Sequence, residues 1–304
     1  MTGYVLESDP RQPGVRGAAP GRARPPAMLN PHARLPATPG AMLRSLGQHA
    51  GLIGQMAQRE AVGRYKGSIL GLAWSFFHPL LMLVVYTVVF SVIFRARWGA
   101  DPNETRTDFA LILFVGMIVH GLFAEVINRA PGLILGNSSY VRRVVFPLEI
   151  LVPVSLLSAL AHTGIGLTVL LAALLLLKGT LMPTVLLLPL VLLPLVLLTL
   201  GLGWILASLG VYVRDIGHAV GIVTTVMLFL SPMFYPIEAV PESFRGFIHV
   251  NPLTLIMEES RKVLIWGRMP DWAGLALYAV VAAAVASVGF WWFQRTRRGF
   301  ADVI

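Results

Sequence analysis

The sequence predicts an all-α integral membrane protein with six transmembrane helices, and two observations carry that prediction. Apolar residues fill 56% of the 304 positions and charged residues 13%, about half the charged share of ordinary soluble domains. Six apolar runs approach or exceed the roughly 20 residues that cross a hydrocarbon core: residues 68–94, 109–127, 150–177, 181–213, 219–235 and 272–293. A water-soluble core of this size has no room for so many Leu, Val and Ile side chains, so lipid must surround much of the chain.

Two segments precede the first run. Residues 1–40 hold eight of the 21 prolines and five arginines without apolar periodicity, so a disordered tail is expected. In residues 41–66, apolar positions recur at three- and four-residue steps: Leu43, Leu46, Ala50, Ile53 and Ala57. This spacing predicts an amphipathic helix in the membrane interface, although a soluble helix packed on a neighbour has the same pattern. The six-span domain then covers residues 67–298, and residues 299–304 form a short cytoplasmic tail.

Prolines interrupt two of the runs. Run 181–213 is too long for one straight crossing and too short for two. Its Pro183, Pro189 and Pro194 are expected to kink it or to mark a part that lies along the interface. Run 219–235 is short and ends among prolines, so we expect its outer end to unwind.

Basic residues predict the orientation. An even number of spans places both termini on one side, and 16 of the 24 Lys and Arg then fall on that side. Cytoplasmic loops carry the excess of basic residues in membrane proteins. Both termini are therefore predicted to be cytoplasmic.

Two connections are longer than a turn requires. Residues 128–149, on the expected inner side, carry arginines and prolines and predict a short surface helix that meets a cytosolic partner. Residues 236–271, on the outer side, contain many apolar positions that a solvated loop would not need. We therefore expect one or two re-entrant helices between the fifth and sixth spans, where protein or a water-filled cavity satisfies the backbone.

The sequence lacks the motifs of self-contained catalysis. Neither Lys66-Gly67-Ser68 nor Lys178-Gly179-Thr180 follows the glycine loop that cradles nucleotide phosphates. Cysteine is absent, and the seven histidines have no metal-ligand spacing on one helix. The formal charge of +9 lies mostly in the tail and beside the runs, where it meets anionic headgroups rather than nucleic acid. The energy source must be another chain or an ion gradient, and no cofactor or metal is expected on this chain.

Ionisable residues within the runs are few. Within the runs they are His78, His120, Glu125 and His162, and Glu149 and Arg214 stand at run ends. Such residues are the usual markers of ion-driven transport. Glu125 is close enough to its span's end to pair with Arg129, four residues on, and the histidines fit hydrogen-bonded core positions. A proton-coupled carrier is expected to bury more acids, so the pattern argues against one.

Six aromatic residues are candidates for lining a channel: Trp74, Phe77, Tyr86, Phe90, Phe234 and Tyr235. Aromatic faces offer apolar contacts without strong directional bonds, which suits a sliding sugar chain. Interfacial belts and lipid-facing packing collect the same residues, so both interpretations stay open. Gly217 and Gly221 form a G-x-x-x-G pair that permits close helix contact.

Four stretches resemble one family. Residues 59–74 (REAVGRYKGSILGLAW), followed by His78-Pro79-Leu80, resemble the start of the first span in ABC-2-type permeases, in particular the bacterial exporters of O-antigen and teichoic acid. Three later stretches are similar too: residues 140–147 (YVRRVVFP), residues 231–236 (SPMFYP), and Asn251-Pro252-Leu253 ahead of Arg261. The resemblance covers about residues 43–304 and keeps the family's order.

The resemblance implies the membrane subunit of an ABC exporter in the bacterial inner membrane. Such a subunit forms a homodimer and works with two separate ATP-binding subunits, which hold the ATP and Mg²⁺. The implied cargo is a lipid-linked polysaccharide such as O-antigen, commonly carried on undecaprenyl pyrophosphate.

The resemblance also implies roles for three groups of residues. The expected coupling segment at the ATPase contains Arg129, Leu133, Asn137 and Tyr140. The expected outer gate, within residues 238–266, contains Glu258, Glu259 and Arg261. Basic residues at the inner leaflet either pair with the lipid pyrophosphate or only set topology: Arg59, Arg64, Lys66, Arg142 and Arg143.

Three other functions stay open. A drug or small lipid is the alternative cargo for the same architecture, and neighbouring glycosyltransferase genes would favour the polysaccharide. A membrane enzyme acting on lipid-linked sugars would need clustered acids or histidines at one membrane face, and none stand out in the sequence. A gradient-driven carrier would lose transport on addition of an uncoupler.

Overall fold

The computed structural model describes residues 37–63, 73–93, 98, 106–141 and 146–304. Every regular element within these ranges is helical, as predicted. The expected tail of residues 1–40 lies almost wholly outside the described part. Four of the expected phosphate-binding residues lie outside it as well: Arg64, Lys66, Arg142 and Arg143.

Four helical stretches of the described chain are long and apolar enough to cross a membrane: Thr107–Gly132, Leu148–Lys178, Pro183–Tyr212 and Trp272–Val303. Their main helices are α4 (Arg106–Arg129), α6 (Leu151–Lys178), α7 (Leu188–Tyr212) and α11 (Trp272–Thr296). Two shorter apolar helices stand where the first and fifth spans are predicted: α3 (Trp74–Tyr86) and α8 (Ile216–Leu230). These lengths and compositions fit a multi-pass membrane protein.

Two of the predicted spans have irregular ends. A π-helical turn, η2 (Thr87–Ile93), continues α3. Ahead of α7, Pro183 begins a 3₁₀ turn, η6 (Pro183–Leu187), and Pro194 lies inside α7. The long proline-containing run is therefore a short 3₁₀ entrance followed by one helix.

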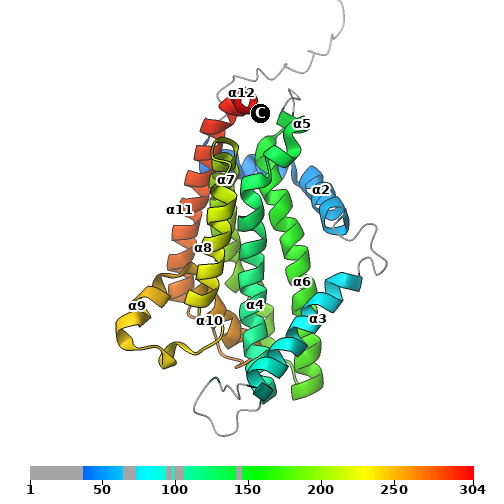
Figure 1. Cartoon of the computed structure of the whole chain (residues 1–304), viewed down its shortest axis with the longest axis vertical. Coiled ribbons are helices and arrows are strands. Elements are labelled where there is room, and N and C mark those ends of the chain that lie inside the picture. The colour runs from blue at the N-terminus through cyan, green and yellow to red at the C-terminus, as the bar shows by residue number, and fades with distance from the viewer. Residues whose placement is uncertain (1–36, 64–72, 94–97, 99–105, 142–145) are drawn as a thin grey trace, which may run out of the picture. The chain divides into compact units, whose positions relative to one another are not determined.

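The predicted amphipathic helix is two helices, α1 (Pro39–Gln48) and α2 (Ala50–Gly63). The break falls at His49, whose backbone leaves the helical region while its ring Nδ1 lies 2.8 Å from the Ser45 carbonyl oxygen. On α2, Ile53 and Ala57 are buried and pack against the start of α6, as shown in Figure 1 by the position of α2 beside that helix. On α1, Leu46 packs against the same cluster, whereas Leu43 is exposed and the adjacent Met42 is buried in its place.

Two glycines hold the centre of the helical packing. A Cβ on Gly201 of α7 would lie 2.6 Å from the backbone nitrogen of Ala286 in α11, and a Cβ on Gly289 of α11 would overlap the Gly201 carbonyl. The two backbones therefore approach as closely as only glycine allows. Within the part of the chain that the structure describes, the predicted Gly217–Gly221 pair makes no such approach, because a Cβ on Gly217 would lie 4.0 Å from Pro131 Cβ and one on Gly221 would meet nothing within 4 Å.

The long connections lie at opposite ends of these helices (Figure 1). At one end, here called the α12 end, are two 3₁₀ turns (Ala130–Gly132 and Leu135–Asn137), the one-turn helix α5 (Ser138–Val141), η5 (Leu148–Ile150), η8 (Arg297–Gly299) and α12 (Phe300–Val303). At the other, the α10 end, are η7 (Ile237–Ala239), α9 (Glu242–Val250) and α10 (Pro252–Leu264). The expected surface helix in residues 128–149 is thus several short turns, and the expected helices in residues 236–271 are two.

Candidate functional site

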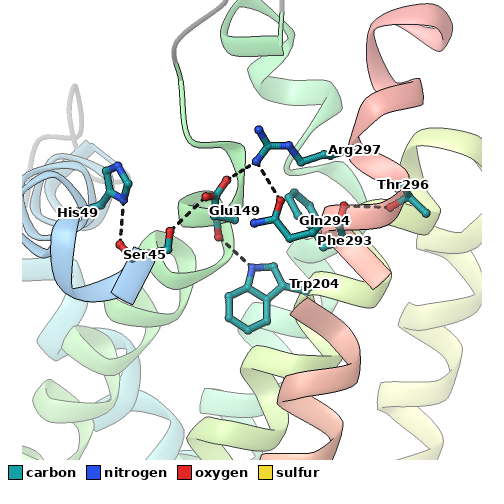
Figure 2. A network of polar contacts seen from close by, with 8 residues as sticks. All are labelled: Ser45, His49, Glu149, Trp204, Phe293, Gln294, Thr296 and Arg297. Carbon is teal, nitrogen blue, oxygen red and sulfur yellow. Dashed lines mark hydrogen bonds and ion pairs between the residues drawn. The ribbon is translucent and has the colours of Figure 1, made fainter. Parts of the chain in front are cut away.

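A buried carboxylate at the α12 end joins four parts of the chain (Figure 2). Glu149 lies in η5, directly before α6, and is 5% exposed. Its Oε1 accepts a hydrogen bond from Ser45 Oγ of α1 at 3.1 Å, and its Oε2 accepts one from Arg297 Nη1 at 2.9 Å. Its backbone carbonyl accepts a third from Trp204 Nε1 of α7 at 2.9 Å. These four residues, the Glu149 cluster, tie α1, the start of α6, α7 and the end of α11 together.

The surroundings of the Glu149 cluster fix the end of α11 against α7. Tyr212 of α7 donates its hydroxyl to the Thr296 carbonyl at 2.8 Å, and Ser208 Oγ lies 2.6 Å from Thr296 Oγ1. Arg297 Nη1 also donates to Gln294 Oε1 at 3.0 Å. The contacts of Ser208 and Tyr212 thus fix the backbone directly before Arg297, from which its guanidinium extends to Glu149.

A second chain of charges crosses α2, α4 and α6. Arg129 Nη2 lies 2.6 Å from Glu60 Oε1 of α2, and its Nη1 lies 3.9 Å from Glu125 Oε1, the i,i+4 partner predicted from sequence. The same Glu125 oxygen lies 3.1 Å from His162 Nδ1 of α6. Arg129, an expected coupling residue, thus links α2 to the end of α4.

The other expected coupling residues follow Arg129 directly. Leu133 is buried, and its carbonyl accepts a hydrogen bond from Asn137 Nδ2 at 2.8 Å. The Tyr140 ring stacks on Phe146, with 4.3 Å between centroids and 12° between planes. The apolar side chain that this segment presents outward is Leu135. The segment is therefore a compact set of turns closed by its own contacts, with Leu135 exposed.

Four of the six expected channel aromatics lie in one region near the α10 end. Phe90 of η2 stacks on Phe234 with 5.3 Å between ring centroids, and Tyr86 lies 6.0 Å from Phe90 and 6.5 Å from Phe234. Tyr235, next in the chain, donates its hydroxyl to the Phe229 carbonyl at 2.8 Å. This group joins η2 to the turn that follows α8.

The other two expected aromatics stand apart from that group. Trp74 and Phe77 are exposed on the first turns of α3. Arg59, the one expected phosphate-binding residue in the described part, is exposed on α2. All three are free to meet lipid or a partner.

The expected gate residues form a buried charge cluster on α10. Arg261 is 0% exposed, and its Nη1 donates to Glu258 Oε1 at 2.6 Å. The Trp98 indole covers the guanidinium, with 4.1 Å between the guanidinium carbon and the ring centroid. Glu259, also buried, accepts from Lys262 Nζ at 2.7 Å and from the Asp271 backbone nitrogen at 2.8 Å. The structure thus brings Glu258 and Arg261 together and turns Glu259 toward the start of α11.

Burial shifts the pKa values of the Arg261–Glu258 pair. Removal from water lowers the pKa of Arg261 to about 10, against the opposing effect of Glu258, so the guanidinium stays charged at neutral pH. Removal from water raises the pKa of Glu258, and the charge of Arg261 opposes that rise. Both shifts show that burial outweighs the pairing.

The sequence indicates one of the residues that organise these sites and misses two. Glu149 stands out only as an ionisable residue at the end of an apolar run, with no partner or role. Trp204 and Trp98 are not predicted. Trp98 has no local signal, because its partner Arg261 lies far along the chain.

Long apolar helices, packed backbone to backbone at their centre and tied by polar clusters at both ends, define a polytopic membrane protein. The chain belongs to the ABC-2 type transporter family, whose family model matches residues 51–265.

Named relatives match along most of their length. The chain is 29% identical over 267 residues to the O-antigen export system permease protein RfbA of Myxococcus xanthus, which covers 86% of this chain and 99% of that protein. It is 23% identical over 264 residues to the protein of the same name in Klebsiella pneumoniae, covering 86% and 98%. It is 24% identical over 234 residues to the polysialic acid transport protein KpsM of Escherichia coli, covering 76% and 88%.

Proposed function

We propose that this chain is the permease subunit of an ABC exporter that moves a lipid-linked polysaccharide, such as an O-antigen, across the bacterial inner membrane. The observation that carries the proposal is the end-to-end similarity to the Myxococcus O-antigen permease, 99% of whose length is covered. ATP and Mg²⁺ belong to separate ATP-binding subunits, so this chain supplies the passage and its partners supply the energy.

In this exporter the chain crosses the membrane six times, with both termini in the cytoplasm and the α12 end facing inward. Helix α3 and its π-helical continuation run for 20 residues from Trp74 to Ile93, about 30 Å at 1.5 Å per residue, which matches a hydrocarbon core. Helix α8 is shorter, and the turn after it completes the crossing. Helices α9 and α10 dip back from the outer side.

Two copies of the chain form the passage, and two ATP-binding subunits bind at the α12 end. The turns after Arg129 meet the ATPase, as Leu135 is exposed there. The Arg129–Glu60 pair and the Glu149 cluster then carry movement from this segment to α1, α2 and α11. The aromatic group around Phe90 lines the outer part of the passage, where a sugar chain slides over ring faces.

The lipid carrier meets basic residues at the inner leaflet. Arg59 is exposed on α2 and is available to phosphate oxygens. Arg64, Lys66, Arg142 and Arg143 are its expected companions. Exposed Trp74 and Phe77, at the start of α3, border the same leaflet.

Deletion and reconstitution test this function. Deleting the gene should remove the exported polysaccharide from the cell surface while its lipid-linked form accumulates inside. The purified chain alone should show no ATPase activity, and co-expression with the ATPase encoded beside it should give a stable complex. Hydrolysis by the lone chain, or normal surface polysaccharide after deletion, would refute the proposal. Loss of small-molecule efflux with intact polysaccharide would favour the drug or small-lipid alternative.

A further inference from the structure

We propose that Arg261 is a positioning residue that fixes α10 to the transmembrane helices, so that α9 is the moving part of the outer gate. This inference rests on the proposed export function, because it assigns a fixed role to α10 and a moving role to α9 in that exporter's outer gate. It follows from how differently the two neighbouring helices are fastened.

The Arg261 guanidinium occupies a slot built against α4. A Cβ on Gly116 of α4 would lie 3.1 Å from Arg261 Nη2, so the missing side chain makes room for the guanidinium. There, Nε donates to the Ile112 carbonyl at 3.2 Å. On the other side, Nη2 donates to the Met233 carbonyl, after α8, at 3.5 Å. The buried guanidinium thus bridges α10, α4 and the turn after α8. If α10 moved away from α4, the charge would lose these partners while still buried, which is costly.

Two further contacts fasten α10 along its length. The Glu259 carboxylate holds the Asp271 backbone nitrogen at the start of α11. Near the end of α10, the Val263 carbonyl accepts from Thr184 Oγ1, ahead of α7, at 2.7 Å. Helix α10 is therefore tied to α4, α7 and α11.

Helix α9 is fastened to much less of the protein. Phe244, Phe247 and Val250 are 60%, 70% and 82% exposed. Arg245 donates to the Val240 carbonyl at 2.8 Å and to the Glu238 carbonyl at 2.9 Å, both within its own segment. Among the described residues, the helix with which α9 chiefly packs is α10. Residues 237–250 therefore form a piece that can move as one.

The junction between the two helices has the form of a hinge. Asn251 Nδ2 donates to the Met227 carbonyl at 3.1 Å and to Ser231 Oγ at 2.9 Å, while its Oδ1 caps α10 by accepting from the Leu253 nitrogen. Asn251 has an extended backbone, and Pro252 begins α10. The fixed side of the pivot is thus α10, and the side left free is α9.

Hydrogen exchange measured by mass spectrometry tests this division of work. In the lone chain and in the complete exporter, both in nanodiscs, amides of α9 should exchange about tenfold or more faster than those of α10. ATP binding in the complete exporter should change exchange in α9 and leave α10 unchanged. Arg261→Met should raise exchange in α10 without affecting α11, and Arg261→Lys should restore part of the protection. The matched control, Arg245→Met, should leave α10 unchanged.

Three results would overturn the proposal: equal protection of α9 and α10, an ATP response in α10, or an unchanged α10 in Arg261→Met. If that variant fails to fold, the comparison of α9 with α10 in the unaltered chain still decides. Failure of the export function would show itself separately, as absence of an ATPase complex or intact surface polysaccharide. The comparison in the lone chain needs neither ATP nor cargo.

Discussion

Replacing Glu149 by Gln tests whether the Glu149 cluster holds the α12 end together. The change keeps the shape of the side chain, but its amide nitrogen must face one of two donors, Ser45 Oγ or Arg297 Nη1. A hydrogen bond to a charged group contributes about 1.5–3 kcal/mol. The Arg297 side chain is 21% exposed and keeps Gln294 as a partner. We therefore expect a loss of about 2 kcal/mol in the free energy of unfolding, below the roughly 3–5 kcal/mol for breaking a fully buried pair, because Arg297 is partly exposed and keeps a partner.

The assay is a double-mutant cycle of Glu149→Gln and Arg297→Gln, read by unfolding of the purified chain in detergent. Because the two residues share one bond, the double variant should be more stable than the sum of the single losses predicts, by about 1 kcal/mol or more. The control is Asp215→Asn, an exposed acid whose side chain caps no helix; it should change stability by less than about 0.5 kcal/mol. Strict additivity, or a Glu149→Gln loss no larger than the control's, would refute the reasoning.

Three further predictions follow from single contacts. Trp204→Phe removes the hydrogen bond to the Glu149 carbonyl and part of a fully buried ring system, so it should cost about 2 kcal/mol or more in the same unfolding assay; no loss would contradict both contacts. Gly201→Val should prevent the α7–α11 approach and abolish monodisperse protein in size-exclusion chromatography, whereas Gly221→Ala should preserve it. The raised pKa of Glu258 means that the folded state keeps its proton as the unfolded state loses one. Stability should therefore fall as pH rises from about 4.5 through the raised pKa. The Tm of the unaltered chain minus that of Glu258→Gln should fall over the same pH range, and a difference that stays flat or rises would contradict the prediction.

The membrane-spanning helices could be predicted because their signal is local. Each apolar run shows its environment within about 20 residues, and α4, α6, α7 and α11 follow directly. The break at His49 could not be predicted, because a ring-to-carbonyl contact leaves no trace in the apolar periodicity. The close approach of Gly201 to Gly289 was also hidden, since the two glycines share no local motif.

The polar clusters depend on pairings across long stretches of chain. Glu149 meets Ser45, 104 positions earlier, and Arg297, 148 positions later. Arg261 reaches Ile112 across 149 positions. No spacing rule for helices or strands covers such distances, so sequence patterns name the charged residue without its partner. Arg261 itself was named only through the family resemblance, which supplied a place for it but no contact.

These pairings divide the helices in a way that bears on transport. Arg129, at one end of α4, binds α2 beside the expected ATPase contact, and the other half of α4 holds the Arg261 slot at Ile112 and Gly116. Ile112 and Arg129 are about 25 Å apart along a helix with a rise of 1.5 Å per residue. We infer that α4 moves as one rigid helix when ATP binds and so transmits that movement to the outer gate. The distance between spin labels at its two ends should then stay constant through the ATP cycle, and a change in that distance would contradict the inference.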